Sequence, residues 1–184
     1  DRLGAWLWVQ DLYGHQRPLL GAGHGFAGNV FPALRGARFL PSDLVEGYAE
    51  RALQTLSATA AHDGPCINWL PAYEPGAAGP VKWLLQDCHG APGIVCRLAD
   101  APRNAAWDAL LLGAGEATWQ AGPLEKGGGL CHGTAGNGYA LLKLWQRSGH
   151  TVWLDRARAF AMHAIEQVQR SADRTGQTRH SLWT

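Results

Sequence analysis

The chain has 184 residues, of which 46% are hydrophobic and 17% are charged, so it is long enough and apolar enough to bury a core of its own. Sixteen Lys and Arg residues against 15 Asp and Glu leave a formal charge of +1, which argues against a dedicated nucleic-acid or anionic-membrane binder, because such proteins carry a basic excess. No uncharged apolar run approaches the roughly 18 residues of a membrane span, and no signal peptide is visible, so we expect neither.

The amino-terminal part contains a glycine motif followed by two predicted helices. The motif is Gly23-His24-Gly25-Phe26-Ala27-Gly28. Small and apolar residues from about 27 to 35 predict a helix that begins within it. Residues 42–60 carry apolar side chains at helical spacing and predict a second, amphipathic helix.

A proline-rich stretch leads to a second glycine motif. Four prolines predict a long irregular loop here: Pro65, Pro71, Pro75 and Pro80. The second motif is Cys88-His89-Gly90-Ala91-Pro92-Gly93. Alternation of β-branched and polar residues is scarce in the whole chain, so we expect no sheet.

The carboxyl-terminal part repeats the arrangement around a third motif, Cys131-His132-Gly133-Thr134-Ala135-Gly136. An amphipathic helix is predicted over 104–119, before the motif. An almost wholly apolar helix of the buried kind is predicted over 133–146, and another amphipathic helix over 151–170.

The three motifs share one pattern, x-His-Gly-x-x-Gly, and indicate an internal repeat. Their histidines are 65 and 43 residues apart, and a period near 43 is the size of a helix pair. An apolar helix after each motif, followed by an amphipathic one, predicts an all-α fold with apolar helices inside and amphipathic helices outside. Such pairs curve into a solenoid or close into a ring, where the His and Cys side chains would surround one centre.

Cys88, Cys131 and His132 form a candidate zinc site. Two thiols and an imidazole are soft ligands, and three protein ligands leave the fourth tetrahedral position open, as in catalytic zinc sites. Buried core thiols, or a disulfide closing a 43-residue loop, are alternatives that spacing leaves open. Since no secretion signal supports bridging, we expect reduced thiols in a cytoplasmic compartment.

Three other residues are weaker candidates. His24 lies in the matching motif, with Gly23 in place of cysteine, and is either an acid/base group facing the metal or a capping or core histidine. Lys126, five residues before Cys131, could hold a carboxylate near the metal or be solvated. Arg174 is predicted in a loop, where an arginine is usually at the surface.

Taken together, the motifs resemble the signatures of the LanC-like proteins, the lanthionine synthetase cyclases and their glutathione-binding eukaryotic relatives. The resemblance rests on the motif runs 21–28, 88–93 and 129–139, in the family's order. It implies an α/α toroid with zinc held by Cys88, Cys131 and His132, and His24 as the active-site histidine. Full-length members are roughly twice as long, so residues 1–184 are expected to form a single domain, the carboxyl-terminal half of a longer toroid.

The variant of the second motif resembles the glutathione-binding branch. Cys88-His89-Gly90 is typical of that branch, and Lys126 and Arg174 match its two glutathione-contacting positions. One departure is Asp87, which replaces the tryptophan usual before the first zinc cysteine.

The resemblance implies zinc-dependent addition of a thiol, preferably glutathione, to dehydroalanine or dehydrobutyrine in a peptide or protein, which forms a thioether. The alternatives are a lanthionine cyclase acting on a peptide cysteine and a non-catalytic zinc-containing module that binds a peptide or protein. A glycosidase-type toroid is disfavoured because no carboxylate pair is identifiable.

Overall fold

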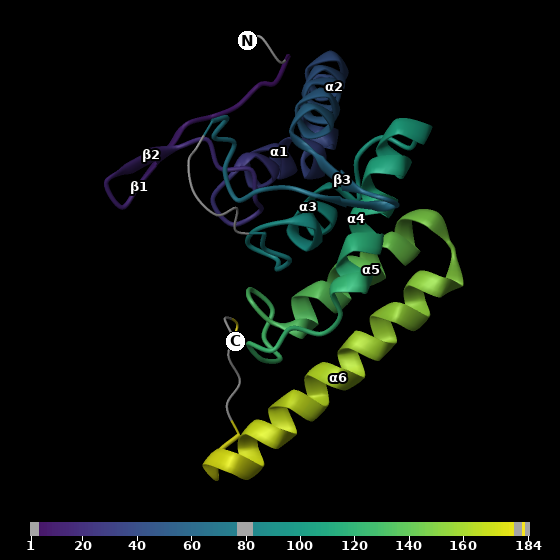
Figure 1. The fold of residues 1–184 in the computed structure, drawn as a ribbon. Helices are drawn as coiled ribbons and strands as arrows, with labels where there is room; N and C mark the ends of the chain where they lie inside the picture. Colours follow the sequence, from purple (N-terminus) through teal and green to yellow (C-terminus); the bar gives the residue numbers. More distant parts are fainter. Residues whose placement is uncertain (1–3, 77–82, 179–181, 183–184) are drawn as a thin grey trace.

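The computed structural model describes residues 4–76, 83–178 and 182, and most of these residues are helical (Figure 1). The prediction of an all-α fold is confirmed. No helix in the described ranges is long and apolar enough to cross a membrane. The helices are α1 (Phe26–Arg35), α2 (Ser42–Thr59), α3 (Ala91–Leu98), α4 (Ala105–Ala121), α5 (Thr134–Ser148) and α6 (Thr151–Thr175), with a short 3-10 helix at Ala37–Phe39.

The helices form two layers, as the repeat predicts. The inner helices α1, α3 and α5 each begin within a glycine motif, and α3 packs against both α1 and α5. The outer helices follow them in order: α2 packs on α1, α4 on α3 and α5, and α6 on α5 (Figure 1). This arrangement is that of a partial α/α toroid, and it brings the three motif loops to the same end of the inner layer.

Two short β-hairpins contradict the expectation of no sheet. Strands β1 (Gln10–Leu12) and β2 (His15–Arg17) are antiparallel, as are β3 (Ala61–Asp63) and β4 (Cys66–Asn68). The turn residues specify them: Tyr13 and Gly14 have φ of 54° and 75°, as a type I′ turn needs, and Gly64 has φ of 55° before Pro65, as in type II′. Strands of three residues are too short for an alternation pattern to detect.

The proline-rich stretch is therefore partly ordered. It begins with the β3–β4 hairpin, which packs on α4. Trp69 follows the hairpin and is fully buried, and its indole N–H donates to the Leu56 carbonyl over 2.9 Å. Pro80 lies outside the described residues.

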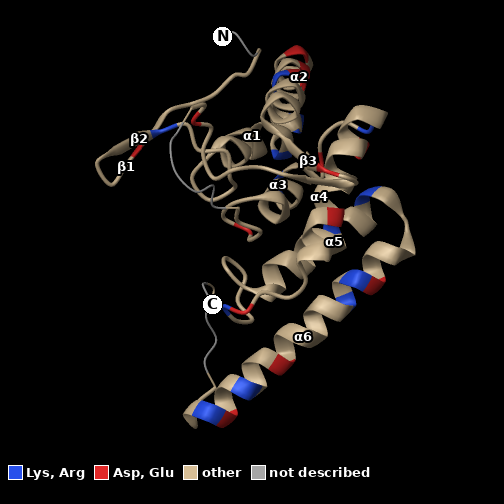
Figure 2. Ribbon diagram, in the orientation of Figure 1, with Lys and Arg blue, Asp and Glu red and all other residues tan. Residues whose placement is uncertain are grey.

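The two carboxyl-terminal helices pair closely but differ from the predicted burial. Helix α5 is not buried all round, since Tyr139 is 46% exposed. Helix α6 extends five residues beyond the predicted end at 170 and presents charged residues along its length (Figure 2). It buries only four residues, Trp153, Ala157, Phe160 and Ala164.

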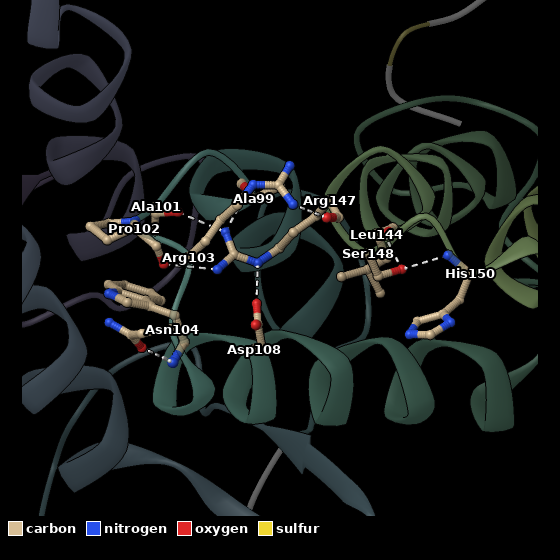
Figure 3. A network of polar contacts seen from close by, with 11 residues as sticks. Ala99, Ala101, Pro102, Arg103, Asn104, Asp108, Leu144, Arg147, Ser148 and His150 are labelled. Atoms are coloured by element: carbon tan, nitrogen blue, oxygen red, sulfur yellow. Dashed lines mark hydrogen bonds and ion pairs between the residues drawn. The ribbon is translucent and has the colours of Figure 1, made fainter.

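A buried arginine ties α5 to the end of α3 (Figure 3). The Arg147 guanidinium donates to the carbonyls of Ala99 and Ala101 over 2.9 and 2.7 Å, and to that of Pro102 over 2.9 Å. It also pairs with Asp108 of α4 over 2.8 Å. These carbonyls belong to the C-cap residue of α3 and to the turn that follows it, and buried backbone carbonyls outside a helix need a donor from elsewhere, which this side chain supplies.

Candidate metal centre

Cys88, Cys131 and His132 come together as the sequence predicts. One donor atom from each of them, two sulfurs and an imidazole nitrogen, lies within 4.8 Å of the other two. Cys88 is buried, whereas Cys131 and His132 are half-buried. All four cysteines are free thiols, so the alternative of a Cys88–Cys131 disulfide is not adopted.

A run of backbone hydrogen bonds joins the motif loops. The Gly23 N–H donates to the Cys88 carbonyl over 3.2 Å, and the Cys88 N–H donates to the Cys131 carbonyl over 3.4 Å. The Cys131 N–H in turn donates to the Leu182 carbonyl over 2.7 Å. The equivalent residues of the three motifs are therefore direct neighbours, which explains how donors 43 residues apart in sequence reach one point.

The last glycine of each motif makes this approach possible. A Cβ atom on Gly28, Gly93 or Gly136 would lie 2.4, 1.7 or 1.9 Å from a carbonyl oxygen of its own loop. In each case that carbonyl belongs to the residue just before the first motif position. The three loops therefore share one local structure, in which a helix start packs directly on the backbone that carries the donor.

The electrostatic surroundings of the donors are unfavourable to thiolates without a cation. Burial raises the pKa of Cys131 to about 11, and the neighbouring Cys88 adds to the increase. Burial also lowers the pKa of His89, and the nearby His24 and His132 lower it further. A divalent cation would supply the positive charge that two crowded thiolates need, and the soft donor set fits zinc.

His24 lies beside this cluster rather than in it. It is exposed, and its effect on the pKa of His89 places it close to that imidazole. His24 is not among the three residues whose donor atoms converge. An exposed imidazole beside the cluster is compatible with acid/base work, and the structure gives no support for His24 as a fourth ligand.

Lys126 and Arg174 line one cleft of about 950 Å³ between the loop 123–128 and α6. Arg174 is exposed and lies in the last turn of α6, not in a loop as predicted. It has no ion-pair partner in the described ranges. Lys126 Nζ donates to Gln86 Oε1 over 2.7 Å, so it is linked to the donor cluster through Gln86.

Two polar residues of the site were not identified from the sequence. Gln86 is 5% exposed, and its Nε2 donates to Cys88 Sγ over 3.0 Å. Asp87, noted only as a departure, forms a two-pronged ion pair with Arg97 of α3 over 2.9 and 3.3 Å. Their closeness to Cys88 in the sequence could have indicated that they lie in the site. Their hydrogen-bond and ion-pair partners, however, are known only from the fold.

Comparison with known proteins matches residues 4–182 to the family described as Lanthionine synthetase C-like protein. The chain is 31% identical over 181 residues to a Danio rerio protein named Glutathione S-transferase LANCL1, a match that covers 96% of this chain and 41% of that protein. It is 37% identical over 111 residues to the Arabidopsis thaliana LanC-like protein GCL1, which covers 56% of this chain and 25% of that protein. The chain thus spans less than half the length of these relatives.

Proposed function

The chain belongs to the lanthionine synthetase C-like family, and from this premise we propose that it adds a thiol to dehydroalanine or dehydrobutyrine residues, with zinc held by Cys88, Cys131 and His132. The observation that carries the proposal is the convergence of these three donors within 4.8 Å. A zinc ion bound there would act as a Lewis acid that stabilises a substrate thiolate near neutral pH. The four free thiols support a reducing compartment such as the cytoplasm.

Glutathione is the preferred nucleophile because two cations line one cleft. Lys126 and Arg174 are suited to hold its two carboxylates, and charge-assisted hydrogen bonds of this kind are the strong ones. The name of the Danio rerio relative, a glutathione S-transferase, favours the same substrate. A peptide cysteine in the same place would instead form a lanthionine ring.

The addition itself needs one new bond and one proton. The substrate sulfur attacks the β-carbon of the dehydroamino acid and forms the C–S bond, and the π electrons move to the α-carbon and its carbonyl as an enolate. His24 donates a proton to the α-carbon, and the solvent, which takes up the proton lost by the thiol, returns one to His24. The product is a thioether, with the thiol added across the former double bond.

The test is to incubate the protein with a dehydroalanine peptide and glutathione and to follow the mass of the peptide. We expect a gain of one glutathione per peptide, and we expect Cys88→Ala to abolish it. An unchanged rate in Cys88→Ala would refute the metal assignment. Stoichiometric zinc without any product would favour a non-catalytic binding module.

Arg174→Gln tests the glutathione assignment separately from the metal. Its rate with glutathione should fall about tenfold, because one charge-assisted pair is lost. Its rate with cysteamine, a thiol without carboxylates, should stay that of the wild type. Equal losses with both thiols would show that Arg174 does not hold a carboxylate.

A further inference from the structure

Gln86 lies between the candidate ligand Cys88 and the cation Lys126. Its Nε2 donates to Cys88 Sγ over 3.0 Å, and its Oε1 accepts from Lys126 Nζ over 2.7 Å. The backbone is held as well, since the N–H and the carbonyl of Gln86 pair with His89 over 3.1 and 3.2 Å. A side chain that is 5% exposed and bonded at both amide atoms has a single orientation.

The donor groups of Lys126 determine which atom of the Gln86 amide faces the Cys88 sulfur. An ammonium group has three donors and no acceptor, so the amide oxygen of Gln86 must face Lys126. The amide NH₂ is then left for Cys88, and the sulfur is the acceptor. A sulfur that accepts a hydrogen bond is stabilised more as thiolate than as thiol, because bonds to charged acceptors are the stronger ones.

The contact also joins the two loops that carry the donors. Gln86 precedes Cys88 on one loop, and Lys126 precedes Cys131 and His132 on the other. Partners outside the ligand shell fix ligand orientation in metal sites and affect affinity strongly. The motifs alone do not reveal this link, because Gln86 and Lys126 are 40 residues apart in sequence.

We propose that Gln86 is a positioning residue for the metal, which aims Cys88 Sγ as a hydrogen-bonded thiolate ligand and couples it to Lys126. The inference rests on the proposed ligand set. It assigns Lys126 a second effect besides holding a carboxylate, because loss of its charge frees the Gln86 amide to rotate. Gln86 is not one of the proposed ligands, and it acts through its contacts with Cys88 and Lys126.

Gln86 could act only by joining the two loops, or also by donating a hydrogen bond to the sulfur. The variant Gln86→Glu distinguishes these two roles. The carboxylate keeps the bond to Lys126, so the two loops stay joined, but it turns an acceptor oxygen toward the sulfur. If the tether alone matters, this variant binds metal like the wild type. Gln86→Met, which is of similar length and has no strong donor, removes both bonds and provides a second variant.

The experiment measures zinc affinity by chelator competition and the sulfur-to-cobalt charge-transfer bands of the cobalt-substituted protein. We expect Gln86→Glu and Gln86→Met to bind zinc about 10–100-fold more weakly. Their bands should move to longer wavelength, because a thiolate that has lost a hydrogen bond gives up an electron more easily. Lys126→Met should shift the bands in the same direction by a smaller amount.

Gln167→Met is the control matched to Gln86→Met, because it removes a hydrogen bond without adding a charge. Gln167 also anchors the loop before Cys131, through its Nε2 to the Leu124 carbonyl over 2.6 Å, and it has no hydrogen bond to the three donors in the part of the chain that is described. This variant should keep the wild-type bands and affinity.

Wild-type bands and affinity in both Gln86 variants would overturn the inference while leaving the ligand set intact. A wild-type protein without thiolate–cobalt bands would overturn the ligand set and the inference together. Failure of the thioether assay, with the Gln86 effect on the metal present, would refute the proposed reaction alone.

Discussion

At the residue scale, the glycine that ends each motif is required by sterics rather than by backbone conformation. A Cβ on Gly136 would lie 1.9 Å from the Leu130 carbonyl oxygen, directly before Cys131. Gly136→Ala therefore has to push this loop away from α5. We expect the free energy of unfolding to fall by about 1–3 kcal/mol, as for overpacked cores, together with weaker zinc binding. Urea unfolding and chelator competition measure the two effects.

Gly47→Ala is the control for this prediction. A Cβ at Gly47 meets nothing within 4 Å, and the residue lies inside α2. Alanine should stabilise the protein by about 0.5–1 kcal/mol, because it costs less conformational entropy in a helix. Equal stability of Gly136→Ala and the wild type would contradict the proposed packing.

The residues of the donor cluster were predictable, whereas those around it were not. Cys88, Cys131 and His132 lie in equivalent motifs of a repeat, which places them near one centre, and the family resemblance rather than the spacing selects them as the ligand set. The contact of Gln86 with Lys126 depends on how two loops cross, and no local pattern records that crossing. His24, Lys126 and Arg174 remain predictions as functional residues, although the fold places the two cations in one cleft.

At the element scale, hydrophobic periodicity predicted the long helices well because it records which face is buried. The helix predicted over 42–60 is observed as Ser42–Thr59. Periodicity could not detect the three-residue strands, which depend on turns such as Tyr13-Gly14. It also predicted too much burial for α5, because the apolar residue Tyr139 of that helix is exposed.

The packing of α3, α4 and α5 depends on Arg147, a residue that hydrophobic periodicity assigns to the polar surface. The side chain of Arg147 is 2% exposed, and its guanidinium donates to three carbonyls and pairs with Asp108. Arg147→Met keeps the length of the side chain but leaves those carbonyls without donors. We expect a loss of about 2–4 kcal/mol in the free energy of unfolding, because each buried acceptor left without a partner costs about 1–3 kcal/mol, whereas the half-exposed Asp108 remains solvated. Equilibrium urea unfolding measures it.

Two variants bracket this prediction. Arg147→Lys should recover only part of the loss, because an ammonium cannot serve the same planar set of acceptors. Arg158→Met removes an exposed arginine of α6, whose side chain is 69% accessible beside Asp155, and should change stability by less than about 1 kcal/mol. Similar losses at both arginines would show that burial of Arg147 is not the cause.

At the scale of the whole molecule, the repeat predicted both the two layers and the meeting point of the motifs. Three equivalent loops on three adjacent inner helices must lie side by side, whatever the details of packing. The loops between repeats are not equivalent, and their hairpin and proline-rich segment did not follow from the repeat. That residues 1–184 form the carboxyl-terminal half of a longer toroid stays a prediction.

The metal should therefore contribute to the stability of the whole fold, because its donors come from the loops that start α3 and α5. A ligand that binds only the folded state at 100 times its Kd adds about 2.7 kcal/mol. For a chain of this size that corresponds to roughly 5–10 °C in Tm. Removing zinc with a chelator should lower Tm by this amount, and adding zinc back should restore it, as differential scanning calorimetry can record. Cys131→Ala should abolish the zinc-dependent shift, whereas Cys66→Ala, which changes a thiol outside the donor cluster, should retain it. A full shift in Cys131→Ala would mean that the metal stabilises the protein from another site.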